Sequence, residues 1–214
     1  VLTEDIELGG QEWTPIGTKE RPWTGEFNGN GKKLINFKSS QPLFGVCQDA
    51  TIKGINFDKT STVEFKGNYT GEKILAALAG SIVNTTIQNC SNNATISMDA
   101  ISTTSQTYVS GLVGMADIDS YIQNCTNGGV INVAASTQAD ADSDFYVGGV
   151  VAYNEGTVSE CKNFGCILAE KSGEIGPAWA CSYNKIPANF TKNTGKGHVG
   201  SYATYKDKPE DADW

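Results

Sequence analysis

A unit of about 35 residues recurs along this chain, and cysteine marks it most clearly. Cys90, Cys125 and Cys161 are 35 and 36 residues apart; each follows an apolar residue by three positions and precedes an asparagine by two. An earlier copy has Ile52 and Ile55 in place of the apolar residue and the cysteine. Because one such unit cannot bury its own apolar face, we expect the copies to stack around one continuous core.

Each unit contains three short apolar runs, which are Leu-x-Gly, Ile-x-x-Cys and a final isoleucine. The runs alternate and are rich in Val, Ile and Thr, a composition typical of strands. Glycine and asparagine between the runs indicate sharp turns, and we find no convincing helix of ten or more residues. The pattern predicts an all-β, parallel β-solenoid with three short strands per coil and coils spaced by roughly 4.8 Å.

Equivalent positions in successive units predict columns of side chains that stack from coil to coil. Two apolar columns form the expected core: Leu43, Leu78, Leu112 and Val150 in one, and Ile52, Ile87, Ile122 and Val158 in the other. A third column, Asn92, Asn127 and Asn163, falls at a turn. Asparagine tolerates left-handed backbone and bonds to nearby backbone or to another asparagine, so we interpret this column as a structural ladder rather than a ligand set.

The six cysteines are Cys47, Cys90, Cys125, Cys161, Cys166 and Cys181. Stacked cysteines are within disulfide reach, but three cannot all pair, so buried free thiols are the expected state of the column. Cys166 and Cys181 lie outside the column, and a loop-closing disulfide between them is an open alternative if the protein is exported. The chain has no Cys-x-x-Cys pair and no histidine near the cysteines, which argues against zinc.

The first part of the chain departs from the repeat. Trp13–Gly17 is followed by Trp23–Gly31, in which Asn-Gly-Asn-Gly predicts a tight turn between two alternating apolar runs. We expect residues 1–42 to form an irregular first coil that caps the open end of the solenoid. Residues 43–171 then form the repeat coils, and residues 172–214 form a last irregular coil or capping segment with a tail, all within one domain.

Taken together, Trp-Thr-Pro-Ile-Gly, Trp-Thr-Gly-Glu-Phe-Asn-Gly-Asn-Gly, Leu-Phe-Gly, Gly-Leu-Val-Gly and Ile-x-Asn-Cys resemble the GLUG-type repeat proteins over roughly residues 10 to 167. These are bacterial surface or secreted proteins, common in Bacteroidetes and often described as adhesin-like. The resemblance implies a right-handed parallel β-helix that is secreted or displayed on the outer cell surface, with any signal or lipid anchor removed. It implies no particular ligand, cofactor or catalytic motif.

Composition excludes several classes of partner. The net charge is −8 and the chain has a single arginine, whereas nucleic acids and anionic membranes require a basic face. No run of 18 apolar residues is present, so we expect no membrane insertion. We expect the protein to be a monomer.

A binding site is expected where the repeat is interrupted. Three insertions, 58–74, 97–107 and 132–145, leave the solenoid at one shared corner and would form a continuous lateral surface. Aromatic rings beside carboxylates suit sugars, although solvated loops with no ligand are the other interpretation. The candidate ligand-binding residues are Asp58, Phe65, Tyr69, Asp99, Tyr108, Asp140, Asp142, Asp144, Phe145 and Tyr146.

The acidic run at 140–144 resembles the start of a calcium loop, because alternate carboxylates can wrap one hard cation. The glycine and glutamate that such a loop requires are replaced by Phe145 and Val151, so we predict a solvated acidic tip and no metal.

Three functions remain open. We expect a non-catalytic, adhesin-like binding module for glycans or host surface proteins. The alternatives are a polysaccharide-degrading enzyme on the same fold and a structural spacer in a larger surface protein. An inverting glycosidase needs two carboxylates roughly 6.5–9.5 Å apart, which Asp117 or Asp119 with a neighbouring acid could supply. No cluster of aspartates is repeated at the coil spacing, so we assign no catalytic residue.

Overall fold

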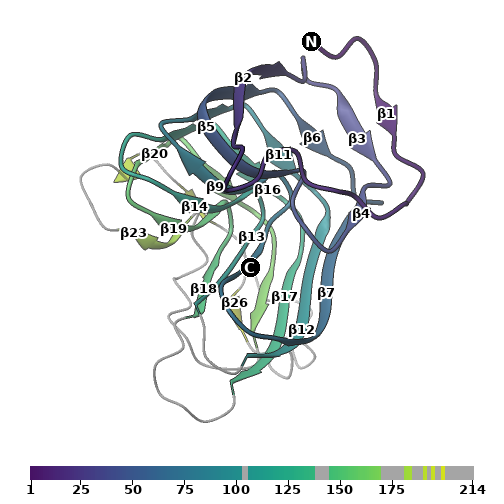
Figure 1. Ribbon diagram of the computed structural model, residues 1–214, viewed down its shortest axis with the longest axis vertical. Coiled ribbons are helices and arrows are strands. Elements are labelled where there is room, and N and C mark those ends of the chain that lie inside the picture. The colour runs from purple at the N-terminus through teal and green to yellow at the C-terminus, as the bar shows by residue number, and fades with distance from the viewer. Residues whose placement is uncertain are drawn as a thin grey trace, which may run out of the picture.

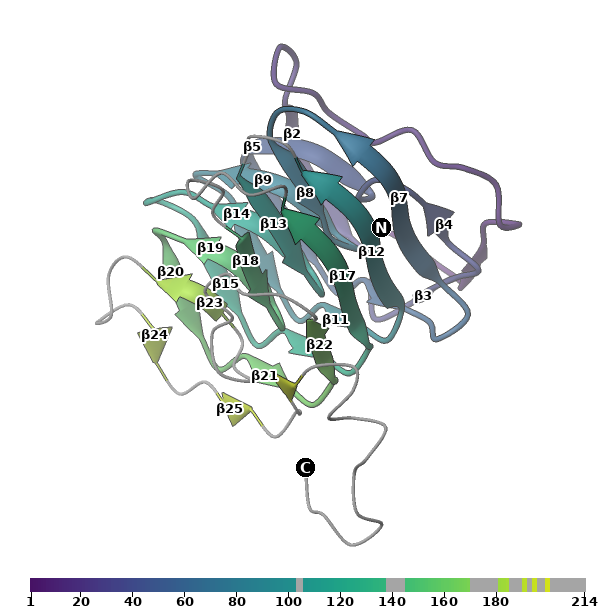
Figure 2. The ribbon, with the colours of Figure 1, turned by 90° about the horizontal axis from the view of Figure 1, so that it is seen from below.

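The computed structural model describes residues 1–102, 106–137 and 145–169, together with four short strands between residues 181 and 200. The described chain is all β, and parallel strands stack into successive coils (Figure 1). The fold is therefore the predicted β-solenoid. The purple N-terminal strands and the yellow-green C-terminal strands lie at opposite ends of the stack (Figure 2).

One complete coil runs from Lys73 to Ser102 and contains five strands. They are β8 (Lys73–Leu75), β9 (Ala79–Val83), β10 (Thr86–Gln88), β11 (Ser91–Asn92) and β12 (Thr95–Ser102). The next coil repeats this order with β13 (Thr107–Ser110), β14 (Val113–Ala116), β15 (Tyr121–Gln123), β16 (Thr126–Asn127) and β17 (Ile131–Thr137). A further coil contains β18 (Phe145–Gly148), β19 (Val151–Asn154), β20 (Thr157–Ser159), β21 (Lys162–Asn163) and β22 (Ile167–Ala169).

The prediction of three strands per coil was therefore too low for this part of the chain. The three apolar runs do form strands, which are β9, β10 and β12 in the coil just described. In these three coils, a two-residue strand at the asparagine position and a return strand before Leu78, Leu112 or Val150 complete the five. Both additional strands are short, and each return strand begins only in the last one or two residues of a segment that the repeat pattern marks as an insertion.

The first coils are built from about the first third of the chain. Their strands are β1 (Ile6–Glu7), β2 (Trp23–Asn28), β3 (Lys33–Ile35), β4 (Lys38–Ser39), β5 (Phe44–Lys53), β6 (Asn56–Phe57) and β7 (Thr62–Tyr69). Strands β2, β3 and β4 pair in parallel with β5, β6 and β7, so residues 23–39 form coil strands of their own. Trp13, Trp23 and Phe27 pack against the core, and the Trp13 indole N–H donates to the carbonyl of Leu43 at 3.0 Å.

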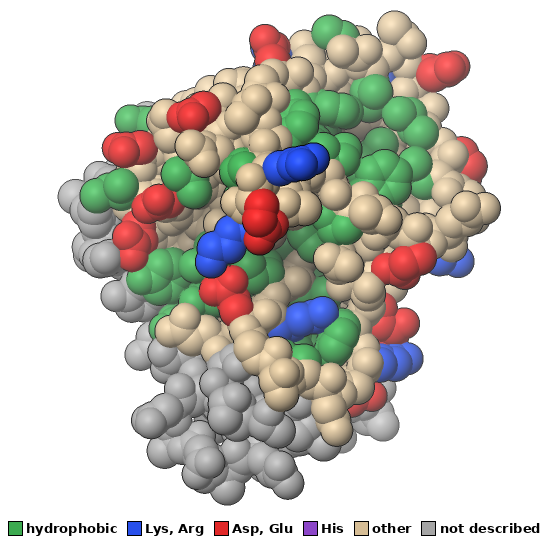
Figure 3. All heavy atoms as spheres, viewed as in Figure 1, with side chains coloured by type: hydrophobic (Ala, Val, Ile, Leu, Met, Phe, Trp, Pro, Cys, Tyr) green, Lys and Arg blue, Asp and Glu red, His purple; other side chains and the backbone are tan. Residues whose placement is uncertain are grey.

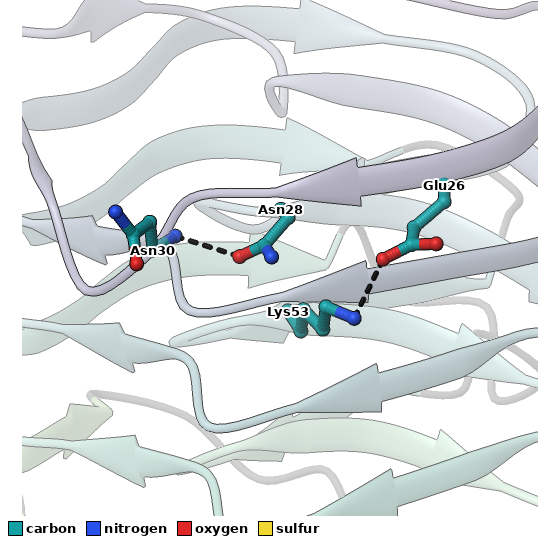
Figure 4. A network of polar contacts seen from close by, with 4 residues as sticks. All are labelled: Glu26, Asn28, Asn30 and Lys53. Carbon is teal, nitrogen blue, oxygen red and sulfur yellow. Dashed lines mark hydrogen bonds and ion pairs between the residues drawn. The ribbon is translucent and has the colours of Figure 1, made fainter. Parts of the chain in front are cut away.

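The tight turn predicted at residues 28–31 is present, but it is a corner of the coil rather than a hairpin. Asn30 and Gly31 have φ angles of 53° and 73°, and the amide of Asn30 donates to Oδ1 of Asn28 at 2.8 Å. The turn connects β2 to β3, which belong to different parallel sheets. Beside it, Lys53 of β5 forms an ion pair with Glu26 of β2 at 2.6 Å, which links neighbouring coils (Figure 4).

The predicted apolar columns are confirmed by the strand register. Ile52, Ile87, Ile122 and Val158 pair in sequence from coil to coil, and all four are fully buried. In the other column, the amide of Leu78 donates to the carbonyl of Leu112, and that of Leu112 to Val150. Successive residues of each column therefore stack across neighbouring coils, and the core is shared between coils.

The asparagine column is a hydrogen-bonded ladder, as predicted. Asn92 donates to Oδ1 of Asn127 at 2.9 Å, and Asn127 donates to Oδ1 of Asn163 at 2.8 Å. Each side chain also donates to the carbonyl two residues further along its own chain, and all three are fully buried. The ladder therefore satisfies polar groups inside the solenoid and holds each turn in shape.

The cysteines of the repeat are buried free thiols, as predicted. Cys90, Cys125 and Cys161 are no more than 1% exposed and form no disulfide. The Cys125 thiol donates to the carbonyl of Gln123 at 3.3 Å, and burial raises its pKa well above the usual range. Cys166 is also a free, half-buried thiol; the side chain of Cys181 lies outside the described residues.

Four short strands continue the stack at the C-terminal end. They are β23 (Cys181–Asn184), β24 (Phe190–Thr191), β25 (Thr194–Gly195) and β26 (Val199–Gly200). Each pairs in parallel with the equivalent strand of the preceding coil, β19, β20, β21 and β22 respectively. These segments therefore follow the coil pattern. The rest of the predicted C-terminal cap and tail, including Trp214, lies outside the described residues.

On the face shown in Figure 3, acidic and basic side chains are interspersed among apolar and neutral ones. Within the described residues, no helix is long and apolar enough to cross a membrane.

Candidate functional site

The insertions are extensions of the solenoid with an apolar interior of their own. Strands β7, β12 and β17 extend from the solenoid side by side, as Figure 2 shows. Met98 of β12 pairs with Phe65 of β7 and with Val133 of β17. The chain then returns through β8, β13 and β18, which form a separate three-stranded sheet in which Val109 pairs with Leu75 and Val147. The prediction of one shared corner is correct, but the proximal parts of the insertions are strands rather than loops.

Two of the predicted aromatic ligand residues are used for packing. Tyr69 is 9% exposed, and its hydroxyl is hydrogen-bonded to Oγ1 of Thr107. Phe65 packs edge-on against the Tyr69 ring at 5.8 Å, and the Lys73 ammonium lies 3.5 Å from the centroid of the Phe65 ring. Burial lowers the pKa of that ammonium. These contacts join the outgoing strand to the returning one, so the rings of Phe65 and Tyr69 offer little surface to a ligand.

The predicted acidic residues do not form one site. Asp58 lies at the turn before β7, at the opposite end of that strand from Tyr69. Its carboxylate accepts the amide of Thr60 at 3.0 Å, and this bond lowers its pKa. Asp99 is exposed on β12 beside Lys66. Asp140, Asp142 and Asp144 lie outside the described residues, as does the side chain of Phe145, so the structure tests neither the calcium-loop interpretation nor their role in binding.

The remaining two candidates, Tyr108 and Tyr146, lie together at the point where the chain re-enters the coil. Their rings stack with centroids 5.2 Å apart and an interplanar angle of 8°. Tyr153 of β19 meets both rings edge-to-face, with centroid separations of 5.9 and 5.4 Å. Tyr108 is 2% exposed and supports the other two, which are half-buried. We call these three residues the tyrosine cluster.

A hollow of about 210 Å³ lies beside the tyrosine cluster on the outer face of β9, β14 and β19. The Tyr153 hydroxyl donates to Oε1 of Glu155 at 2.8 Å, which fixes the ring and the carboxylate against each other. Asp117 also lines the hollow, and one of its oxygens accepts the amide of Ile118 at 2.7 Å. The lining of this tyrosine hollow is Ser81, Val83, Met115, Ala116, Asp117, Tyr153 and Glu155.

A second and larger depression, of about 490 Å³, lies further toward the N-terminal end of the same lateral face. We call it the N-terminal groove. One wall is β8, the floor is the outer surface of β5 and β9, and the other wall is the segment around Pro15. Its lining residues are Thr14, Pro15, Gly17, Thr18, Gln41, Pro42, Gly45, Val46, Glu72, Lys73, Ile74 and Gly80.

Neither depression contains a recognisable catalytic or metal-binding arrangement among the described residues. No group of three or more His, Cys, Asp and Glu side chains there is arranged to hold a metal ion. Asp117 and Glu155 share the tyrosine hollow, whereas Asp119, the other acid considered from the sequence, does not line it.

Sequence reasoning missed Tyr153, Glu155 and Met115, because it searched only the insertions. The repeat itself contained the signal. Tyr153 pairs with Met115, and Met115 with Ser81, so the three occupy one column on the outer face of the sheet. Because the coils are in register, the residues two positions after the aligned Ala79, Val113 and Val151 could be expected to stack in one column.

No family model matches the chain, so the likeness to GLUG-type repeats rests on the sequence motifs alone. No curated protein matches it either. Among solved structures, the fold resembles a Bacteroides ovatus protein described as a "putative immunoglobulin A1 protease", with a TM-score of 0.40 and 16% identity. The match covers 95% of this chain and 77% of the other.

Proposed function

We propose that this chain is a non-catalytic, adhesin-like binding module of an exported bacterial surface protein, and that its tyrosine hollow binds glycans. The observation that carries the proposal is the Tyr153 ring, which packs against a tyrosine pair and lines the hollow together with two carboxylates. Aromatic faces pack against the C–H groups of a pyranose ring, while the carboxylates of Asp117 and Glu155 accept hydrogen bonds from its hydroxyls.

The size of the hollow favours a small ligand unit. Its volume of about 210 Å³ is below the 300–1,000 Å³ typical of pockets for drug-sized molecules, and it is open on one side. Such a hollow suits one sugar ring of a longer chain. We therefore expect weak affinity for a single glycan and stronger attachment where several copies of the module act together.

A glycan array followed by calorimetric titration with the best oligosaccharide tests this proposal. Tyr153→Ala should weaken binding by roughly tenfold or more, because it removes the stacking surface. Tyr121→Ala is the matched control, since Tyr121 is 54% exposed on β15, on another face of the coil. Absence of binding to any glycan, or equal loss in both variants, would contradict the proposal.

The enzymatic alternative is tested with the same oligosaccharides. Release of reducing ends or of unsaturated product by the wild-type protein, abolished by Glu155→Gln, would replace the binding function with a catalytic one. The spacer alternative predicts no glycan binding at all.

A further inference from the structure

Strand β8 is the open edge of the return-strand sheet in the described part of the chain, because the order there is β18, β13, β8. The preceding coil has no equivalent strand. There β4 ends at Ser39, and the chain soon reaches buried Leu43, which belongs to the same column as Leu78, so no room remains for a return strand between Ser39 and Leu43. The solenoid therefore lacks one return strand at this level. The N-terminal groove lies beside the edge where that strand would fit.

The backbone of β8 presents bonding groups to this groove. The amide of Lys73 donates to the carbonyl of Gln106, the residue just before β13, at 3.1 Å. In a parallel ladder, successive residues direct their backbone groups to opposite sides of the strand. The N–H and C=O of Ile74 therefore point away from β13 and toward the groove. An edge of this kind accepts an added strand.

The groove floor carries a glycine, Gly80, beside the position that the inward side chain of such a strand would take. Where the return strand is present, its side chain covers a glycine of the following coil: a Cβ on Gly114 would collide with Cγ2 of Ile74. Gly80 precedes Gly114 in the same column and lines the groove, with Cγ of Pro42 3.4 Å from its Cβ position. Pro42 therefore already covers Gly80, as Ile74 covers Gly114. A strand one coil spacing from β8, about 4.8 Å away, would pack its inward side chain beside the Pro42 ring.

We propose that the N-terminal groove binds an extended segment of another polypeptide, which adds to β8 as a fourth parallel strand. The residue beside the Pro42 ring should be β-branched or aromatic, as are Ile74, Tyr108 and Tyr146, which occupy this column in the protein's own return strands. The N-terminal groove shares no lining residue with the tyrosine hollow, so this proposal stands or fails separately from glycan binding.

The probe is a fluorescein-labelled peptide that copies residues 106–111, Gln-Thr-Tyr-Val-Ser-Gly, compared with the same peptide in which glycine replaces the tyrosine. Fluorescence anisotropy should show saturable binding of the first peptide and roughly tenfold or more weaker binding of the second. Amide hydrogen exchange on the wild-type protein should show new protection at Ile74 when the peptide is bound.

Val46→Trp should abolish peptide binding, because Val46 lines the groove and a larger side chain fills it. Gln123→Trp, at an exposed position on β15, is the control and should bind normally. No saturable binding, binding without protection of Ile74, or equal binding of both peptides would overturn the proposal. So would sedimentation showing that the groove pairs two copies of the chain and excludes the peptide. If Val46→Trp does not fold, the exchange measurement on the wild-type protein decides alone.

Discussion

Asn92 donates its side-chain amide hydrogen to Oδ1 of Asn127 across 2.9 Å, and neither side chain is exposed to solvent. The two residues are 35 positions apart and lie directly above one another in adjacent coils. Each also fixes its own turn, since Asn127 donates to the carbonyl of Gly129 at 3.1 Å. One side chain therefore shapes a corner and also sets the spacing between coils.

Replacing Asn127 by leucine should destabilise the protein strongly. The change keeps the volume similar but leaves the amide of Asn92 and Oδ1 of Asn163 without their partner. An unsatisfied buried polar group costs about 1–3 kcal/mol, so we expect a loss of about 3 kcal/mol in the free energy of unfolding, measured with urea.

Asn124→Gly is the matched control for this ladder. Asn124 also bonds to its equivalent, Asn89, at 2.6 Å, but it is exposed and has a φ angle of 50° that glycine adopts without strain. We expect a change below about 1 kcal/mol. A similar loss in both variants would show that burial does not strengthen the Asn92–Asn127–Asn163 ladder.

Much of the core could be predicted from the sequence because a repeat fixes the register. Once Cys90, Cys125 and Cys161 are aligned, every position in one coil has a known neighbour in the next. A strand slipped by one residue would turn all its apolar side chains outward, so this alignment also predicts which faces are buried. Ile122 illustrates this, since it is predicted to be central and is fully buried between Ile87 and Val158.

Ile122→Asp should prevent folding, because an unpaired charge would lie in the apolar column. Ile122→Ala gives a measurable intermediate, with an expected loss of about 2–5 kcal/mol from the cavity it leaves. Tyr121→Asp changes the neighbouring residue, which is 54% exposed, and should alter stability by about 0.5 kcal/mol or less. Far-ultraviolet circular dichroism and urea melts distinguish the three variants, and a folded Ile122→Asp protein would refute the inward assignment.

Gly80→Ala tests why the Leu-x-Gly motif carries glycine. A Cβ at this position would lie 2.6 Å from the carbonyl oxygen of Gly45 in the preceding coil, so the backbones would have to separate. We expect a loss of about 1–3 kcal/mol, as for other overpacked sites. Ser81→Ala at the adjacent, half-exposed position should be nearly neutral, and thermal melts of the two variants together check the prediction.

The candidate site was harder to predict than the core, for a physical reason. Outward-facing positions are not constrained by packing, so the repeat shows where they stack but not which of them form a surface. Tyr108 and Tyr146 were identified because they border an insertion. Tyr153 lies in β19, a strand of the coil itself. Its contact with Tyr108 and Tyr146 depends on the angle between the sheet that contains β19 and the sheet of return strands. That angle follows from the return strands, which the repeat pattern does not show.

Cys47 should make the protein lose stability at alkaline pH. Burial raises the pKa of its thiol to about 12, whereas an unfolded cysteine titrates near pH 8.5. Between these values the unfolded state has released its proton and the folded state has not, so the stabilisation present below pH 8.5 is lost as the pH rises toward 12. At pH 10 the penalty from this residue is about 2 kcal/mol.

The measurement is the difference in unfolding free energy between pH 8 and pH 10 for three proteins. Cys47→Ala should lose about 2 kcal/mol less over this interval than the wild type, because it has no thiol to ionise. Ile82→Val is the control: Ile82 pairs with Cys47, and its substitution costs about 0.5–1.5 kcal/mol at both pH values while leaving the thiol in place. An alkaline loss in Cys47→Ala equal to that of the wild type would mean that this thiol is hydrated in the folded protein and does not belong to the dry core.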